Sequence, residues 1–169
     1  MARDPNHFSY ISKCKPDVPV VLGDARLTLA DAPDGSYDVI IVDAFSSDAI
    51  PIHLMTREAM ALYASKIAPN GIIVMHLSNR HLELASVVAG VAQQNGLVAR
   101  LNDDETEIVD DDKYRYASTV MAIAHKDEDF GALTKSTHWA KQTANPDQRV
   151  WTDDYSNVVG AIVRKLRRR

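Results

Sequence analysis

The sequence predicts an α/β domain with a mostly parallel sheet and flanking helices. Tyr37 to Val42 is apolar without alternation, which is typical of a parallel strand that is covered on both faces. Ile72 to His76 is a second such run, and residues 56 to 68 between the two repeat apolar side chains at helical spacing. Strands that alternate with helices imply right-handed crossovers, so we expect a single domain over residues 1–169.

Upstream of these runs, the chain carries signals for a short strand and a short helix. Val18 to Leu22 is expected as a buried strand that ends at the turn pair Gly23-Asp24. Leu27, Leu29 and Ala30 favour a helix directly after that turn.

The central helices have recognisable ends. Thr56 is a good N-cap for the helix over 56 to 68, and Pro69-Asn70-Gly71 is expected to end it. The next helix follows Ser78 or Asn79, either of which can cap it, and ends near Asn95-Gly96. Its expected core face consists of Leu84, Val87, Val88 and Val91.

The last part of the chain continues the alternation. Leu97 to Leu101 and Tyr116 to His125 are predicted strands, and the acidic segment Asn102 to Lys113 between them is a predicted solvated loop. Asp129 to Ala140 and Asn157 to Arg168 are predicted helices.

Charge and cysteine content restrict the class of protein. The formal net charge is −4, without the basic field of nucleic-acid binders, so we expect no nucleic-acid partner. The cations from Arg164 to Arg169 are interpreted as solvated groups that oppose a helix dipole. Cys14 is the single cysteine, and no apolar stretch is long enough to span a membrane. We therefore predict a cytoplasmic protein, with no membrane contact by this segment.

Two aspartates follow predicted strands, at the edge where sheets of this kind bind ligands. Asp24 can accept a hydrogen bond from an adenine amino group or a ribose hydroxyl, and it can equally well cap the following helix. Asp43 ends the most apolar strand. A carboxylate there can act as a general base or anchor a cationic amine, and its alternative is a residue that caps a turn.

The segment Ala44 to Ile52 after this strand has the composition of a loop. Ser46 and Asp48 suit a gate over a ligand, although Ser, Asp and Pro are equally common in surface loops. His53 adds weak support for a site here.

Two further clusters have a structural alternative. His76 and His81 have no third ligand at a metal-binding spacing, so we predict no metal site and interpret them as polar residues at a strand end. The segment Trp151 to Asn157 carries two carboxylates and a tyrosine that suit the border of a cationic ligand. The favoured alternative is that Asp154 or Ser156 caps a helix while the tryptophan packs on the core.

Several segments resemble the spermidine synthase (polyamine aminopropyltransferase) family, and most closely its bacterial spermidine synthase-like members. The resemblance extends over nearly the whole chain and is carried by Val20 to Arg26 (VVLGDAR), Tyr37 to Asp43 (YDVIIVD), Thr56 to Glu58, Leu62 to Val74 and Trp151 to Asn157 (WTDDYSN). The resemblance implies the Rossmann-like fold of S-adenosylmethionine-dependent methyltransferases.

The resemblance also implies a site and a co-substrate. Decarboxylated S-adenosylmethionine or S-adenosylmethionine would bind, without a metal, together with a polyamine or other small amine. Asp24 would contact the adenine, and Asp43 would lie beside the attacking amine. The residues implied for the nucleoside are Asp24, Ala25, Asp43 and Ala44, and those implied for the amine are Ser46, Asp48 and Asp154.

This chain departs from the family pattern in two ways. The family's second aspartate, three residues after the first, is replaced here by Ser46. None of the seven glycines forms a G-x-G, so the glycine-rich loop and the first two strands of the family fold are expected to be missing. In the family sheet those strands separate Val18 to Leu22 from Tyr37 to Val42. Unpaired edges then predict either a homo-oligomer or direct pairing of the two runs.

Three functions remain open from the sequence. The first is aminopropyl transfer from decarboxylated S-adenosylmethionine to a polyamine acceptor. The second is methyl transfer from S-adenosylmethionine on the same fold, which the loss of the second aspartate favours. The third is a non-catalytic remnant that oligomerises, which the missing glycine loop favours.

Overall fold

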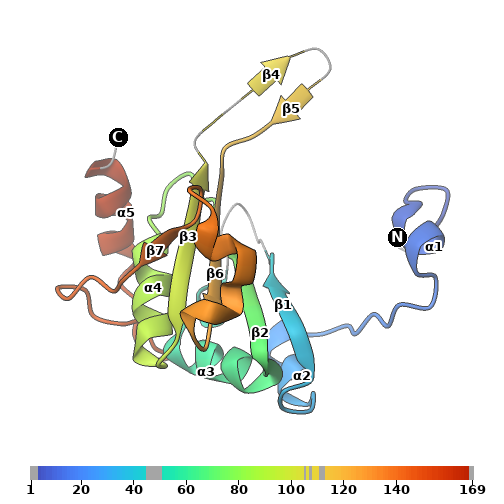
Figure 1. The fold of residues 1–169 in the computed structure, drawn as a ribbon, viewed down its shortest axis with the longest axis horizontal. Helices are drawn as coiled ribbons and strands as arrows, with labels where there is room; N and C mark the ends of the chain where they lie inside the picture. The colour runs from blue at the N-terminus through green and yellow to red at the C-terminus, as the bar shows by residue number, and fades with distance from the viewer. Residues whose placement is uncertain (1–3, 45–50, 105, 107, 111–112, 168–169) are drawn as a thin grey trace. The chain divides into compact units, whose positions relative to one another are not determined.

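The computed structural model describes residues 4–44, 51–104, 106, 108–110 and 113–167. The chain divides into two compact units, Met1–Asp31 and Ala32–Arg169. The first unit contains the short helices α1 (Tyr10–Cys14) and α2 (Ala25–Ala30). The second unit contains the sheet (Figure 1).

The predicted strand over Val18 to Leu22 is not formed. Its backbone has no regular secondary structure, and Val21 and Leu22 are 72% and 90% exposed. An apolar run becomes a strand only when a neighbour satisfies its backbone N–H and C=O groups, and no described strand pairs with this one. The expected direct pairing with Tyr37–Val42 is therefore also wrong.

A five-stranded sheet forms the centre of the second unit. Its spatial order is β1 (Tyr37–Val42), β2 (Ile67–His76), β6 (Ser118–Ala124), β3 (Val98–Asp104) and β7 (Ala140–Gln142). The α/β class is confirmed. The expectation of a mostly parallel sheet is wrong, because among these described strands β1 and β2 are the parallel pair and the other three pairings are antiparallel.

The direction of β6 explains this difference. The chain leaves β3, passes through the antiparallel strands β4 (Ile108–Asp110) and β5 (Lys113–Arg115), and returns as β6 between β2 and β3. A tight reversal produces antiparallel pairing, whereas parallel neighbours need a long crossover. The predicted loop over Asn102 to Lys113 is wrong for the same reason, since β3 extends to Asp104 and strand pairing resumes four residues later.

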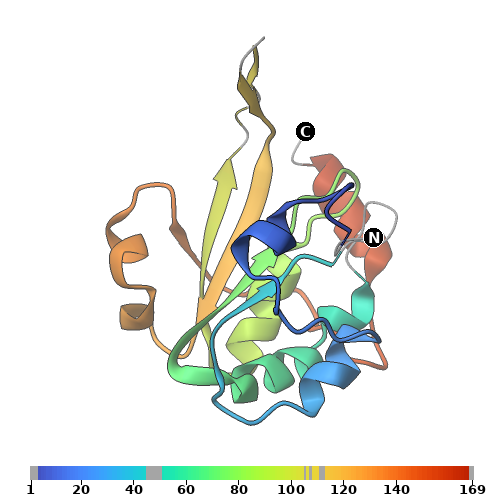
Figure 2. The same cartoon turned by 90° about the vertical axis from the view of Figure 1, so that its right-hand side faces the viewer.

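Each face of the sheet packs against a different layer. Helices α3 (Arg57–Lys66) and α4 (Ala85–Gln94) cover one face, and the 3-10 segment η2 (Asp127–Lys135) covers part of the other (Figure 2). Phe130 of η2 is buried against the alanines of β6. The fully buried sheet residues on the helix side are Ile73, Met75, Met121 and Ile123.

The helix predicted over 56 to 68 is confirmed as α3, but it ends earlier. The Thr56 side chain accepts the N–H of Ala59 at 3.2 Å, as an N-cap should. At the other end, the buried Lys66 ammonium donates to the Ala32 carbonyl and to an Asp34 carboxylate oxygen, each at 2.7 Å. The backbone then becomes extended, so the Pro-Asn-Gly segment lies inside β2.

Helix α4 begins with a different cap from either residue predicted. Asn79 Oδ1 accepts the N–H groups of His81 and Leu82 at 2.8 Å and closes a turn before the helix. Glu83 accepts the Ser86 N–H at 3.0 Å and takes the capping role. The predicted core face is confirmed, because Leu84, Val87, Val88 and Val91 are all buried.

Two predictions near the C-terminal end have opposite outcomes. The helix expected over Asp129 to Ala140 is wrong: Gly131, with φ 53° and ψ −120°, interrupts the 3-10 segment η2, and β7 follows. The terminal helix is confirmed as α5 (Val158–Arg167). Within the described ranges, no helix is long and apolar enough to cross a membrane.

Candidate functional site

The carboxyl ends of the parallel pair β1 and β2 bring Asp43 and His76 together. Val42 is the register partner of Met75, so the next residue of each strand lies on the same face of the sheet. The Nδ1 atom of His76 lies 2.9 Å from Oδ1 of Asp43, and its Nε2 atom lies 2.7 Å from the Ser78 hydroxyl. A carboxylate, an imidazole and a hydroxyl therefore form a continuous array at the edge where ligands are expected.

The array continues into the neighbouring strand β6. The backbone N–H of Thr119 donates to Ser78 Oγ at 2.9 Å, and the Leu77 N–H donates to the Thr119 carbonyl at 2.7 Å. The side chains of Asp43 and His76 are 59% and 36% exposed, so solutes reach the carboxylate end of the array. Its other end is held by sheet hydrogen bonds.

The predicted loop residues have mixed outcomes. Ser46 and Asp48 lie outside the described residues. Ala44 directly follows Asp43 and is partly buried, and His53 is exposed on the short 3-10 turn η1 (Ile52–Leu54). The roles predicted for these residues remain predictions.

Asp24 caps helix α2. Its Oδ1 atom accepts the N–H groups of Arg26 and Leu27 at 2.9 and 3.1 Å, and its backbone is extended as an N-cap requires. The capping interpretation of Asp24 is therefore confirmed. The adenine contact remains a prediction, and Ala25 is the first residue of α2.

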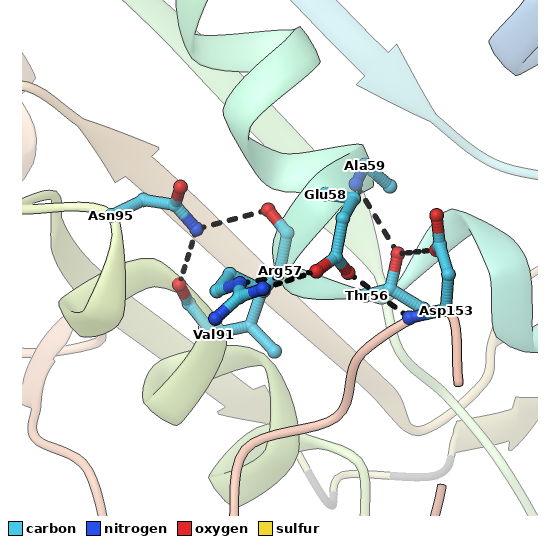
Figure 3. A network of polar contacts seen from close by, with 7 residues as sticks. All are labelled: Thr56, Arg57, Glu58, Ala59, Val91, Asn95 and Asp153. Carbon is cyan, nitrogen blue, oxygen red and sulfur yellow. Dashed lines mark hydrogen bonds and ion pairs between the residues drawn. The ribbon is translucent and has the colours of Figure 1, made fainter. Parts of the chain in front are cut away.

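The segment Trp151 to Asn157 is hydrogen-bonded to the start of α3 through Asp153 (Figure 3). Thr56 Oγ1 donates to Asp153 Oδ1 at 2.7 Å, and the Asp153 N–H donates to Glu58 Oε2 at 3.0 Å. The Arg57 N–H donates to the Trp151 carbonyl at 2.9 Å. One of the segment's two carboxylates is thus committed to a structural contact.

The helix caps expected in this segment are wrong, whereas the packing of the tryptophan is confirmed. Trp151 is fully buried. Asn157 Oδ1 accepts the Gly160 N–H at 2.8 Å and caps α5 in place of Asp154 or Ser156. Asp154 is exposed in the turn that the Thr152–Tyr155 bridge closes, so its predicted contact with an amine stays a prediction.

The hydrogen bonds around Glu58 lower the pKa of its carboxyl group. Burial raises the pKa of Glu58, but hydrogen bonds at its own backbone, from the Arg57 guanidinium and from the Asp153 N–H outweigh it and hold the pKa below its ordinary value. Glu58 is therefore a carboxylate kept ionised by donors that surround it.

The histidines do not assemble a metal site in the part of the chain that the structure describes. No group of three or more His, Cys, Asp or Glu side chains comes together there. His81 is exposed beside the Asn79 turn, and His76 faces Asp43 instead.

Sequence reasoning missed that His76 and Ser78 belong to the same array as Asp43. The signal was present in the spacing: Ser78 lies two residues after a histidine that ends the strand following Asp43. Alternate residues of an extended chain share one face. The register of the two strands, which brings Asp43 beside this pair, comes from the three-dimensional structure.

Comparisons with known proteins agree with this fold and with the motifs. No family model matches the chain. Over 62 residues it is 34% identical to a probable polyamine aminopropyl transferase from Bifidobacterium longum, a match that covers 37% of this chain and 14% of that protein. Its fold is similar to that of a probable spermidine synthase from Corynebacterium glutamicum, with a TM-score of 0.57 and 18% identity. The chain is thus similar to a polyamine aminopropyl transferase over a short segment, and it has a fold like that of a spermidine synthase.

The structural likeness covers 90% of this chain and 62% of the Corynebacterium protein, so the chain spans less than two thirds of that relative. A spermidine synthase from Thermotoga maritima is similar over 90% of this chain and 49% of its own, with 12% identity and a TM-score of 0.47. The predicted resemblance is confirmed as a likeness of sequence over 62 residues and as a likeness of fold.

Proposed function

We propose that this chain takes part in aminopropyl transfer from decarboxylated S-adenosylmethionine to a polyamine-type amine, with Asp43 as the residue that receives the amine. The observation that carries the proposal is the placement of Asp43. Its exposed carboxylate stands at the carboxyl end of β1 and is oriented by His76 at 2.9 Å. The motifs shared with polyamine aminopropyltransferases support the same chemistry.

The chemistry requires a carboxylate at such a position. The amine nitrogen attacks the carbon beside the sulfonium sulfur, a carbon–nitrogen bond forms, the carbon–sulfur bond breaks, and methylthioadenosine leaves. An ammonium has no lone pair, so one proton must leave the nitrogen before or during the attack. Asp43 would bind the cationic amine, align it and accept that proton.

The nucleoside side of the proposal uses residues named from the resemblance. Asp24, which follows the predicted strand and caps α2, would accept a hydrogen bond from the adenine amino group. Ala25 and Ala44 would line the nucleoside, and Ser46, Asp48 and Asp154 would contact the amine. The co-substrate itself supplies the electrophilic sulfonium.

Calorimetric titration of the chain tests the proposal against its two rivals. Tight binding of decarboxylated S-adenosylmethionine and methylthioadenosine, with weak binding of S-adenosylmethionine, supports aminopropyl transfer. Preferential binding of S-adenosylmethionine overturns it in favour of methyl transfer. Absence of binding by all three overturns it in favour of a non-catalytic chain. In the supporting case, Asp24→Ala should weaken methylthioadenosine binding about tenfold, the effect of losing a hydrogen bond to a charged acceptor.

We also propose that the chain forms a homo-oligomer through the outer edge of β1. Among the described strands, β1 pairs with β2 alone, and its Val39 and Ile41 side chains are 50% and 70% exposed. An unpaired apolar edge is a template for strand pairing with a second copy. Sedimentation velocity should show a dimer that Ile41→Lys converts to a monomer, and a wild-type monomer at high micromolar concentration would contradict the proposal.

A further inference from the structure

We propose that His76 and Ser78 are positioning residues for Asp43, and that the Thr119 N–H and the Asp43 carboxylate, at the two ends, together set the direction of the hydrogen bonds that link them. The inference rests on the proposed function only for the ligand, a cationic amine. The hydrogen-bond chain itself follows from the described contacts, which link β6 to β2 and β2 to β1.

The direction of each hydrogen bond follows from which of the groups can donate and which can accept. A backbone N–H can only donate, so Ser78 Oγ accepts at the Thr119 contact of 2.9 Å. At the other end, an ionised Asp43 carboxylate can only accept, so Nδ1 of His76 carries the hydrogen and Nε2 accepts from the Ser78 hydroxyl, 2.7 Å away. A neutral imidazole that accepts at Nε2 carries its hydrogen on Nδ1, and that hydrogen is donated to Oδ1 of Asp43 at 2.9 Å.

One of the two carboxylate oxygens of Asp43 is therefore occupied by the hydrogen bond from His76. Oδ1 of Asp43 receives the imidazole N–H, so Oδ2 is the oxygen presented to an incoming ammonium. Because the opposite tautomer would point the Nδ1 lone pair at the carboxylate, the hydrogen bonds favour a fixed rotation of the Asp43 carboxyl group.

The anchor of the chain is rigid. Thr119 accepts the Leu77 N–H at 2.7 Å and donates its own N–H to Ser78, so both of its backbone groups are engaged by the segment that follows β2. Its side chain donates to Asp103 Oδ1 at 2.7 Å on the neighbouring strand β3. Strands β3, β6, β2 and β1 thus all contribute to the orientation of one carboxylate.

The first test reads the tautomer directly. Nitrogen-15 correlation spectra of the full chain at about pH 8, where an ordinary histidine is neutral, should show His76 with its hydrogen on Nδ1. The signal is assigned by its loss in His76→Gln. Ser78→Ala should raise the fraction of the Nε2–H tautomer, because one of the two contacts that favour Nδ1–H is lost, whereas Ser78→Thr should keep the wild-type state. A wild-type hydrogen on Nε2, or no change in Ser78→Ala, would overturn the proposal.

The second test asks whether the chain positions the amine. Putrescine affinity, measured by calorimetry, should fall about tenfold in His76→Ala, the effect expected for losing a hydrogen bond to a charged group. His76→Asn should retain affinity within about threefold, because its amide N–H replaces Nδ1–H toward Asp43. His76→Gln should not, because its amide stands where Nε2 was. His81→Ala, on the exposed turn, is the matched control.

The two tests separate the inference from the proposed function. Equal putrescine affinity in wild type and His76→Ala, or equal losses in the asparagine and glutamine variants, would overturn the positioning role. Failure of wild type to bind putrescine, with the Nδ1 tautomer present and sensitive to Ser78→Ala, would overturn the proposed function and leave the hydrogen-bond chain standing.

Discussion

The carboxyl end of β1 and the segment after Trp151 contain the same kinds of side chain but use them differently. At β1, the Asp43 side chain is 59% exposed, and its Oδ1 atom is hydrogen-bonded to His76. In the other segment, Asp153 bonds to Thr56 through its side chain and to Glu58 through its backbone. Acidic residues in a sequence therefore indicate a site only when their donors leave one oxygen for a ligand.

The largest effect should come from the structural region. Trp151→Ala removes a fully buried side chain, so we expect a loss of about 3–5 kcal/mol in the free energy of unfolding, measured by urea denaturation. Its indole N–H has no hydrogen-bond partner among the described residues, so Trp151→Phe should be clearly milder. Equal losses in both variants would show that the indole N–H matters more than the packing.

The next effect should appear in the ligand site and in binding alone. Asp43→Asn keeps the shape of the side chain but removes its charge, so putrescine affinity should fall at least about tenfold. The urea midpoint should stay close to wild type, because the group is exposed at a strand end. Asp153→Asn is the matched control, with the opposite expectation of lower stability and unchanged affinity. An unfolding loss in Asp43→Asn comparable to that of Asp153→Asn would break the comparison.

A smaller effect is expected at the start of α3. Thr56→Ala removes both the N-cap and the hydrogen bond to Asp153, which should lower the free energy of unfolding by about 1–2 kcal/mol. Thr56→Ser keeps the hydroxyl and should recover most of this loss. If thermal unfolding shows the serine variant no better than alanine, the methyl group and not the cap stabilises this region.

The smallest effect is a pH dependence carried by Glu58. Its pKa in the folded chain is lowered, so its stabilisation is complete above its ordinary value of 4.5 and is lost as the pH falls through the folded value. Glu58→Gln should therefore be less stable than wild type at neutral pH, with a difference that shrinks below about pH 4.5. A constant difference across that range, in urea titrations at each pH, would contradict the assignment.

The sequence predicted the elements whose signals are local. The unbroken apolar run Tyr37 to Val42, the N-cap Thr56 and the buried face of α4 all formed as expected. Asp43 also stands at the end of this strand as predicted, but the expected coverage of the strand on both faces is wrong, because Val39 and Ile41 are exposed.

The failures share a different cause. Val18 to Leu22 has the composition of a strand but lacks a partner among the described strands, and strand formation depends on that partner. Gly131 interrupts the helix predicted over Asp129 to Ala140, and the antiparallel strands β4 and β5 lie where a loop was predicted. Asn79 and Asp154 do not cap the helices for which they were predicted. Glu83 caps α4 and Asn157 caps α5 instead.

By itself, the sequence determined the α/β class, the resemblance to spermidine synthases and the acidic residue at the end of β1. These depend on periodicity and on short motifs, which are properties of neighbouring residues. Only the tertiary structure decided that His76 and Ser78 join Asp43, because that contact requires the register of β1 against β2 and the antiparallel return of β6. Pairing between strands is set by packing across the whole sheet, and no single segment encodes it.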